Sequence, residues 1–210
     1  MNNINKIKFF FRDTLLPNSL FLMSKTSREK KLYLTFDDGP VPEVLSPLLS
    51  LLDTYQVKAT FFVIGSRGER HVDLLNEIHQ KQHTLANHSY THPNFHKITH
   101  NKKCLEIHEA NQLIEKITKR PCRLFRAPQG RWNVKLLWHL FKENITASHW
   151  SRDSMDFTKK PAHEIIADFN KQPVQSGDII LFHDDAKLCI EVLTVLIPQW
   201  QAQGFTLSAL

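Results

Sequence analysis

Short apolar runs alternate with longer segments of helical periodicity along most of the chain. Apolar residues recur at helical spacing in those longer segments, as Leu45, Leu48, Leu49 and Leu52 illustrate, and predict helices over 42–55, 72–80, 103–118, 133–141, 161–170 and 186–200. The apolar runs have the length of buried strands and lie at 32–36, 59–64, 84–86, 123–125, 145–148, 178–182 and 205–207. This alternation predicts an α/β fold with parallel strands joined by helical crossovers.

Polar residues follow these predicted strands at the point where each strand ends. They are Asp37, Asp38, His88, Arg126, Asp156 and His183. In a closed (β/α) barrel the carboxyl ends of the strands share one face, and that face carries the active site. An open doubly wound sheet would gather the same residues in a crevice. Seven predicted strands favour a small or incomplete barrel, and the lack of a glycine-rich dinucleotide turn counts against nucleotide binding.

Composition narrows the class of protein. The 210 residues fit one domain, and a hydrophobic content of 41% with 14 Phe and 4 Trp is enough for one large core. The net charge of +6 suits an anionic partner, but the basic residues are dispersed and form no basic-aromatic repeat, so no nucleic-acid partner is expected. Three isolated cysteines indicate neither a disulfide framework nor a thiolate zinc site.

The first 30 residues differ from the rest. Residues 7–11 are basic and apolar, but polar residues and a proline soon interrupt the apolar stretch, and no small-residue cleavage site follows. We therefore interpret 1–30 as an extension that packs on a catalytic domain at 31–210, with a peripheral membrane contact as the alternative. No run reaches the length of a transmembrane helix, and a cytoplasmic location is expected.

Two adjacent carboxylates, Asp37 and Asp38, end the first strand, and Gly39 and Pro40 then turn the chain. Neighbouring carboxylates repel each other, so keeping both ionised requires a cation, a proton or an arginine nearby. The alternative is a solvated turn, which this composition also favours.

Two histidines, His88 and His92, are four residues apart and would face the same way if one helical turn formed there. Two histidines and a carboxylate, with positions left open for water and substrate, make a catalytic zinc site. A solvated histidine face is the alternative, because His96 and His100 continue the spacing, although Pro93 opposes one unbroken helix.

Five ordered motifs resemble those of the polysaccharide deacetylases, the carbohydrate esterases of the NodB-homology type (carbohydrate esterase family 4). They span residues 31–184 and read Thr35-Phe36-Asp37-Asp38-Gly39-Pro40, His88-Ser89-x-x-His92, Arg126-x-Pro128-x-Gly130, Asp156 and Leu181-x-His183. The resemblance implies a distorted, seven-stranded (β/α) barrel. It also implies a divalent metal, usually zinc but also cobalt or nickel, held by Asp38, His88 and His92.

The same resemblance implies roles for the other motif residues. Asp37 would be the general base and His183 the general acid, with Arg126 paired to Asp37 and Asp156 orienting His183. Asp153 competes with Asp156 for that last role. Leu181 would line a pocket for the acetyl methyl group, although a core role for it is expected in any case.

The reaction implied is hydrolysis of an N-acetyl group on an N-acetylated glycan, which makes the chain a polysaccharide or oligosaccharide N-deacetylase. Zinc lowers the pKa of bound water from ~15.7 to ~7, and an imidazolium can protonate the leaving amine near neutral pH. The metal and a backbone amide near Gln129 could hold the oxyanion.

Two departures from the family pattern concern the substrate. The family commonly has an aromatic residue at Gln129, beside Gly130, and tryptophan at Phe157. Trp132 could supply a stacking surface for a sugar or could belong to the core. Two further acids, Asp178 and Asp184, flank the last motif and are interpreted as a turn acid and a residue that supports the site from behind.

Three functions remain open at this point. The first is the glycan N-deacetylase. The second is a metal amidohydrolase or O-deacetylase with a substrate that is not a glycan. The third is a catalytically silent carbohydrate-binding domain, which the two intact proton carriers, Asp37 and His183, disfavour.

Overall fold

The computed structural model describes residues 20–24, 29–158 and 160–210. The strands are β1 (Phe21–Leu22), β2 (Lys31–Asp37), β3 (Thr60–Val63), β4 (Thr84–Asn87), β5 (Leu124–Phe125), β6 (Thr146–Ser148), β7 (Arg152–Asp153), β8 (Ile179–His183) and β9 (Thr206–Ser208). The helices are α2 (Pro42–Thr54), α3 (Gly65–Arg70), α4 (Val72–Gln80), α5 (His100–Thr118), the 3₁₀ turn η1 (Pro128–Gly130), α6 (Val134–Lys142), α7 (Ala162–Lys171) and α8 (Leu188–Ala202).

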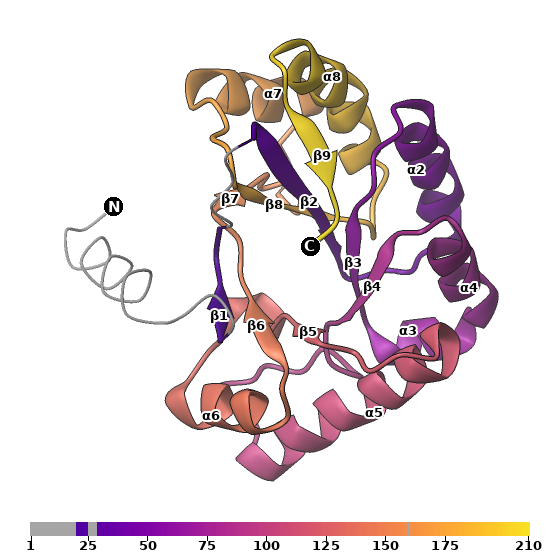
Figure 1. The fold of residues 1–210 in the computed structure, drawn as a ribbon, viewed down its shortest axis with the longest axis vertical. Coiled ribbons are helices and arrows are strands. Elements are labelled where there is room, and N and C mark those ends of the chain that lie inside the picture. The colour runs from indigo at the N-terminus through magenta and orange to yellow at the C-terminus, as the bar shows by residue number, and fades with distance from the viewer. Residues whose placement is uncertain (1–19, 25–28, 159) are drawn as a thin grey trace.

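The strands form one curled parallel sheet with the helices on its outside (Figure 1). Its order is β1-β6-β5-β4-β3-β2-β8-β7, with β9 also paired to β2. An isolated antiparallel bridge between Ser24 and Asp178 connects the segment after β1 to the start of β8. The α/β class and the parallel strands are confirmed, and the architecture is a partial barrel.

The predicted number of seven strands is wrong. All seven predicted strands are present, but β1 and β7 add two more, each of two residues. Two residues carry no period that a sequence pattern can detect. Both strands form because a long neighbour offers an edge: β1 pairs with β6, and β7 pairs with β8.

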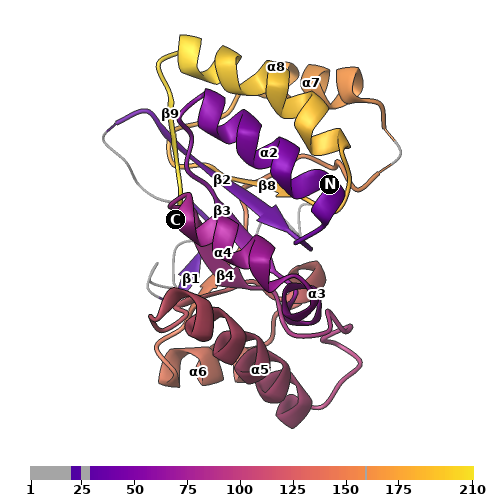
Figure 2. The ribbon, with the colours of Figure 1, turned by 90° about the vertical axis from the view of Figure 1, so that its right-hand side faces the viewer.

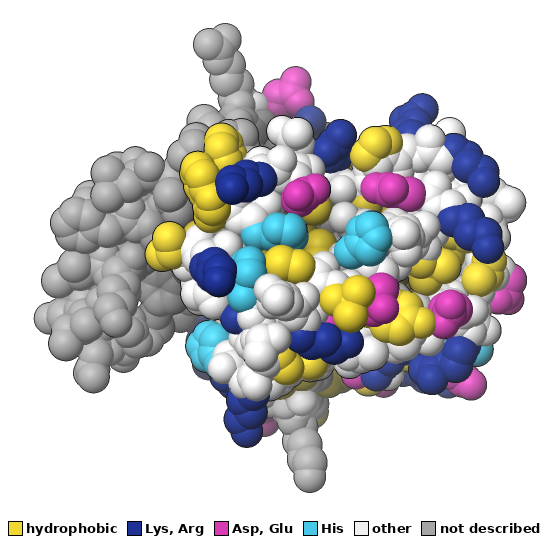
Figure 3. Space-filling model, turned by 90° about the horizontal axis from the view of Figure 1, so that it is seen from below, with side chains coloured by type: hydrophobic (Ala, Val, Ile, Leu, Met, Phe, Trp, Pro, Cys, Tyr) yellow, Lys and Arg dark blue, Asp and Glu magenta, His cyan; other side chains and the backbone are white. Residues whose placement is uncertain are grey.

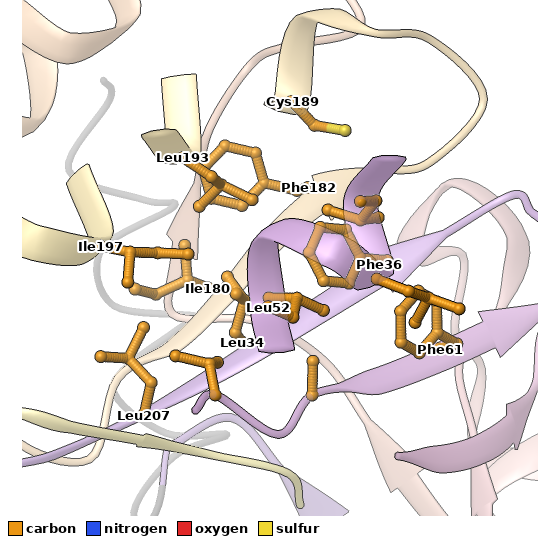
Figure 4. Close-up of a cluster of buried hydrophobic side chains, with 14 of the residues drawn as sticks. Leu34, Phe36, Leu52, Phe61, Ile180, Phe182, Cys189, Leu193, Ile197 and Leu207 are labelled. Carbon is orange, nitrogen blue, oxygen red and sulfur yellow. The ribbon is translucent and has the colours of Figure 1, made fainter. Parts of the chain in front are cut away.

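The main core lies between the sheet and the helices around it. Alternate residues of β2, Leu34 and Phe36, point outward into this layer, where Phe36 stacks on Phe61 of β3. In Figure 4, side chains of α2 and α8 meet these strand residues. Figure 2 shows α2, α7 and α8 on one part of the barrel and α5 and α6 on another. The second group covers a smaller cluster that includes Phe21, Phe95 and Phe125.

The six predicted helices are confirmed, with ends that differ by up to three residues, but α3 is a helix that the pattern missed. Its sequence, Gly-Ser-Arg-Gly-Glu-Arg, contains no apolar side chain and therefore no hydrophobic period. Among the described residues, no helix combines the length and apolar character that a membrane span requires.

Only part of the predicted N-terminal extension can be placed. Phe21 and Leu22 are buried and join the sheet through β6. Residues 1–19 and 25–28 lie outside the described residues, and the predicted membrane contact falls on them. The division at residue 30 and the peripheral contact stay predictions.

Candidate active site

The carboxyl ends of β2, β7 and β8, with the loops that follow β4, β5, β6 and β7, surround a cavity of about 350 Å³. It is lined by Asp37, Asp38, His88, His92, Gln129, Trp150, Asp153, Phe157, Leu181, His183 and Asp185. On the face shown in Figure 3, histidine and carboxylate side chains gather with hydrophobic ones near the middle. Of the six polar residues that follow predicted strands, Asp37, Asp38, His88 and His183 line this cavity, and Arg126 and Asp156 lie behind it.

Asp37 and Arg126 form a buried ion pair inside the barrel. Arg126 Nη1 donates to Asp37 Oδ1 at 2.6 Å and to Thr35 Oγ1 at 2.9 Å. Thr35 and Asp37 are two residues apart in β2 and so lie on the same face. The guanidinium also donates to the carbonyls of Ser148 and His149, and its carbon lies 4.0 Å from the centre of the Phe62 ring.

This pairing sets the charge of Asp37. Burial raises the pKa of Asp37, and the adjacent Arg126 charge and hydrogen bond counter part of that rise. Neither side chain can move far, because Arg126 is fully buried and four of its N–H groups are bonded. The arrangement holds a carboxylate at the cavity wall with a fixed direction for its second oxygen.

Asp38, His88 and His92 form a cluster next to Asp37. Asp38 Oδ1 lies 3.4 Å from His88 Nε2 and 3.3 Å from His92 Nε2. His88 Nδ1 lies 2.9 Å from the Arg126 carbonyl oxygen. A carbonyl only accepts, so Nδ1 carries the proton and Nε2 presents a lone pair to the cluster. Burial lowers the pKa of His88 to about 3, which keeps this imidazole neutral.

A loop, and not the predicted helical turn, brings the two histidines together. Ser89 and His92 have positive φ values of 68° and 54°, and Ser89 Oγ accepts a hydrogen bond from the His92 amide at 3.0 Å. Asn87 Oδ1 accepts from the Ser89 amide at 2.7 Å, which starts the turn. His88 and His92 therefore face the same way, as predicted, but the helical turn from which this was predicted does not form.

The cluster has the properties of a divalent metal site. Its three candidate ligand atoms all lie within 4.8 Å of one another. Asp38 Oδ1 is buried and has no hydrogen-bond partner among the described residues, a costly state that a cation would relieve. A neutral imidazole with a fixed tautomer and a carboxylate are ligands that zinc accepts. The residues therefore fit a divalent metal.

His183 lies on the other side of the cavity and is held by Asp156. Its Nδ1 donates to Asp156 Oδ1 at 2.7 Å, and its amide donates to Asp156 Oδ2 at 2.8 Å. Asp153 makes neither contact, so the geometry favours Asp156 of the two candidates. Burial lowers the pKa of His183, but the hydrogen bond to Asp156 and the charge of Asp37 outweigh it and raise the pKa to about 9.

The predicted substrate residues divide into two groups. Gln129, Phe157 and Leu181 line the cavity, where Phe157 is 61% exposed and meets the His183 ring edge-on at 5.4 Å. Gly130 lies behind the wall, with a φ of +63° and no room for a side chain against His149 and Trp150. Trp132 packs edge-on against Phe21 and Phe125 in the smaller core cluster and does not line the cavity.

Two cavity residues were not predicted to be site residues. Trp150 contributes a ring that lies 4.0 Å, centre to centre, from the His149 ring. Asp185 lies at the rim. A signal for Trp150 existed, because it follows a predicted strand by two residues, as Asp38 and His88 do.

Comparison with known proteins places this architecture in one family. The sequence model described as Polysaccharide deacetylase matches residues 24–148. A chitooligosaccharide deacetylase of Rhizobium leguminosarum bv. trifolii is 30% identical, with coverage of 88% of this chain and 92% of the relative. A peptidoglycan-N-acetylglucosamine deacetylase of Bacillus cereus is also 30% identical, with coverage of 92% of each chain.

Solved structures agree with the sequence comparison. The crystal structure of a peptidoglycan N-acetylglucosamine deacetylase superposes with a TM-score of 0.87 at 26% identity, covering 91% of each chain. A pseudoenzyme of carbohydrate esterase family 4 from Bacillus anthracis superposes with a TM-score of 0.85 at 22% identity, covering 93% of this chain and 68% of that one. The second likeness shows the fold alone, so a functional argument must rest on the site residues.

Proposed function

Because this chain belongs to the polysaccharide deacetylase family, we propose that it removes N-acetyl groups from amino sugars of a glycan, with Asp37 as base and His183 as acid. The observation that carries the proposal is the placement of a proton acceptor and a proton donor around one ligand cluster. Asp37 and His183 are paired in register on the neighbouring strands β2 and β8. Their carboxylate and imidazole therefore line one cavity.

The cluster of Asp38, His88 and His92 would hold a divalent metal, for which zinc is our first choice and cobalt or nickel the alternatives. When bound, the metal would supply a Lewis acid for the amide carbonyl and would lower the pKa of a water molecule. His88 is prepared for this role by its buried, neutral ring and by the carbonyl that fixes its tautomer.

Asp37 accepts the proton of the attacking water. Burial raises its pKa toward the range in which a carboxylate is an effective base, while Arg126 keeps it ionised. The second oxygen, Oδ2, lies 3.5 Å from His88 Nε2 and so faces the ligand cluster. Water attack forms a bond to the acetyl carbon, and the water proton passes to this oxygen.

His183 gives a proton to the leaving nitrogen. An amine leaves poorly until it is protonated, so the carbon–nitrogen bond breaks as the imidazolium donates. Asp156 supports this step because it holds Nδ1–H, which leaves the other ring nitrogen as the donor atom. The products are a free amine and acetic acid, which keeps the second proton of the water until it ionises to acetate. Asp37 then releases its proton to solvent and His183 takes one up, so both groups return to their starting states.

The cavity walls suit a small acyl group on a sugar. Leu181 supplies an apolar surface for the acetyl methyl group, and the exposed Phe157 ring and the partly buried Trp150 ring supply aromatic planes for a pyranose ring. Gln129 lines the cavity and has a left-handed backbone conformation, with a φ of 56°. Its backbone amide is our candidate donor to the oxyanion.

The test is acetate release from N-acetylglucosamine oligomers by the metal-loaded protein. We expect release from the oligomers, and none from small N-acetylated amides or acetate esters at equal concentration. Elemental analysis should show one metal per chain. Release from the amides or esters alone would replace the glycan with another substrate class, and an inactive protein with bound metal would favour the silent binding domain.

A further inference from the structure

We propose that Asp184 is a positioning residue that locks the turn carrying Asp37 and Asp38, and that Gly39 is the position into which it fits. This inference rests on the proposed function, because it assigns Asp38 to the metal. Asp184 follows β8 and lies 145 residues from the turn that it contacts. Its side chain is fully enclosed, with 1% of the residue exposed.

Asp184 contacts the turn through two hydrogen bonds. Its backbone amide donates to the Asp37 carbonyl at 3.1 Å, which extends the pairing of β8 with β2 by one residue. Its side chain accepts from the Gly39 amide through Oδ1 at 2.7 Å. The peptide groups on both sides of Asp38 are therefore bound to one residue.

Two further contacts complete the support of the turn. Arg67 Nη1 of α3 donates to the Asp38 carbonyl at 2.6 Å, and the Ile64 amide donates to the Gly39 carbonyl at 3.0 Å. Asp38 itself has a φ of 79°, a conformation that costs free energy for a residue with a side chain. The surroundings must hold it there, and in that conformation its carboxylate lies 3.4 Å from His88 Nε2 and 3.3 Å from His92 Nε2.

A glycine is needed at residue 39 because a side chain there would clash with Asp184, and not because the backbone adopts a positive φ. Its φ is not among the positive values of the described glycines. A Cβ on Gly39 would lie 2.0 Å from Asp184 Oδ2 and 2.5 Å from its carboxyl carbon, far closer than atoms can approach. The absence of a side chain at residue 39 is thus what lets the Asp184 carboxyl lie against the turn.

Burial of the Asp184 carboxyl costs more free energy than burial of an apolar side chain in the same place would. Its Oδ2 is buried and has no hydrogen-bond partner among the described residues. A buried polar atom without a partner loses its hydrogen bonds to water and gains none in return, which destabilises the folded state. An apolar residue would fill the same space without that cost. What Asp184 adds is one hydrogen bond to the Gly39 amide, which fixes the geometry of the turn.

The first test measures the affinity for Zn²⁺ and Co²⁺ by competition with a chelator. Asp184→Ala should weaken binding about 10–100-fold, the usual range for a residue that orients a metal ligand. Asp184→Asn retains an acceptor oxygen for the Gly39 amide and should stay within a few-fold of the wild type. Asp73→Ala, which removes an exposed carboxylate from α4, is the matched control and should have no effect.

The second test uses the steric relation between the two residues. Gly39→Ala should also weaken metal binding, because the methyl group displaces the Asp184 carboxyl. Asp184→Ala removes that obstacle, so the double variant should bind metal more tightly than Gly39→Ala alone. Independent effects would instead add, and that result would overturn the proposal.

Amide hydrogen exchange of the metal-free protein gives a readout that needs neither metal nor substrate. The Gly39 amide should exchange faster in Asp184→Ala than in the wild type, and Asp184→Asn should restore its protection. Unchanged metal affinity and unchanged exchange in Asp184→Ala would sink the proposal. A wild type that binds metal but releases no acetate would reject the proposed function, while the effect of Asp184 on affinity would still stand.

Discussion

The two sides of the cavity control a proton by opposite means. On the accepting side, Asp37 and Arg126 are buried in the barrel, and burial is the main influence on the pKa of Asp37. On the giving side, His183 stays partly open to solvent, and the carboxylate of Asp156 raises its pKa to about 9 against the effect of burial. Both groups have a charged partner, but burial outweighs the partner for Asp37, whereas the nearby carboxylates outweigh burial for His183.

The difference follows from position in the barrel. Arg126 enters from the loop after β5 and crosses the interior to β2, so its ion pair is part of the core. Asp156 comes from the loop after β7 and binds the end of β8 at the rim. We therefore expect changes on the accepting side to affect folding and chemistry together, and changes on the giving side to affect mainly the pH dependence of the reaction.

The largest expected effect is the loss of the base. Asp37→Asn should lower kcat by about 10²–10⁴-fold, the usual contribution of a general base. The ligands Asp38, His88 and His92 remain, so elemental analysis should still find the metal. Normal acetate release by this variant would assign the base to another residue.

Removal of the arginine should be nearly as severe, but through stability. Arg126→Met leaves the Asp37 carboxylate buried without its partner, which costs about 3–5 kcal/mol of unfolding free energy. Urea denaturation of the metal-free protein measures this loss. The double variant Asp37→Asn with Arg126→Met should recover part of the stability, because no unpaired charge then remains.

On the giving side, Asp156→Asn should change the pH profile more than the fold. Loss of the carboxylate lowers the pKa of His183, so the alkaline limb of kcat should move from near pH 9 to lower pH. We expect kcat below pH 7 to fall about 10²-fold, the lower end of the range for acid catalysis. The profile from pH 6 to 10 provides the check, and an unmoved alkaline limb would remove His183 from the acid role.

The same pair should also make stability depend on pH. The folded pKa of His183, about 9, lies above its unfolded value of about 6.5, so its contribution is complete below pH 6.5 and disappears as pH rises to 9. Burial raises the pKa of Asp184 from 3.8 to about 8, so in every variant its contribution lowers stability as pH rises through that range, and the loss remains above pH 8. Urea unfolding of the metal-free wild type and Asp156→Asn at several pH values should show a steeper decline in the wild type.

The smallest effect should come from the exposed rim. Phe157→Ala removes the ring beside His183 without touching either ion pair. We expect KM for N-acetylglucosamine oligomers to rise a few-fold, about 1 kcal/mol of lost aromatic contact, with little change in kcat. Phe157→Trp should keep or improve KM. A large fall in kcat for Phe157→Ala would instead mean that the ring positions the acid.

Much of the site was predictable because parallel strands give polar residues a common edge. A single sequence showed that Asp37, His88, Arg126 and His183 follow strands, and the barrel geometry then requires them to meet. The ordered motifs supplied the family, which the comparisons confirm.

Other features were not predictable from a local pattern. The turn of His88 and His92 depends on left-handed residues and an asparagine cap, and α3 lacks any apolar residue to give a period. Trp132 could stack on a sugar or on the core, and only the packing of β1 against β6 supplies the Phe21 ring that it contacts.

The sequence by itself determined the order of strands and helices and the residue types at the strand ends, because hydrophobic periodicity and turn chemistry are local properties. Only the tertiary structure decided which of those groups are buried, which are paired and which face one another. The contact of Asp184 with Gly39 illustrates the reason. It joins residues 145 positions apart, and no pattern within either segment indicates that the two are in contact.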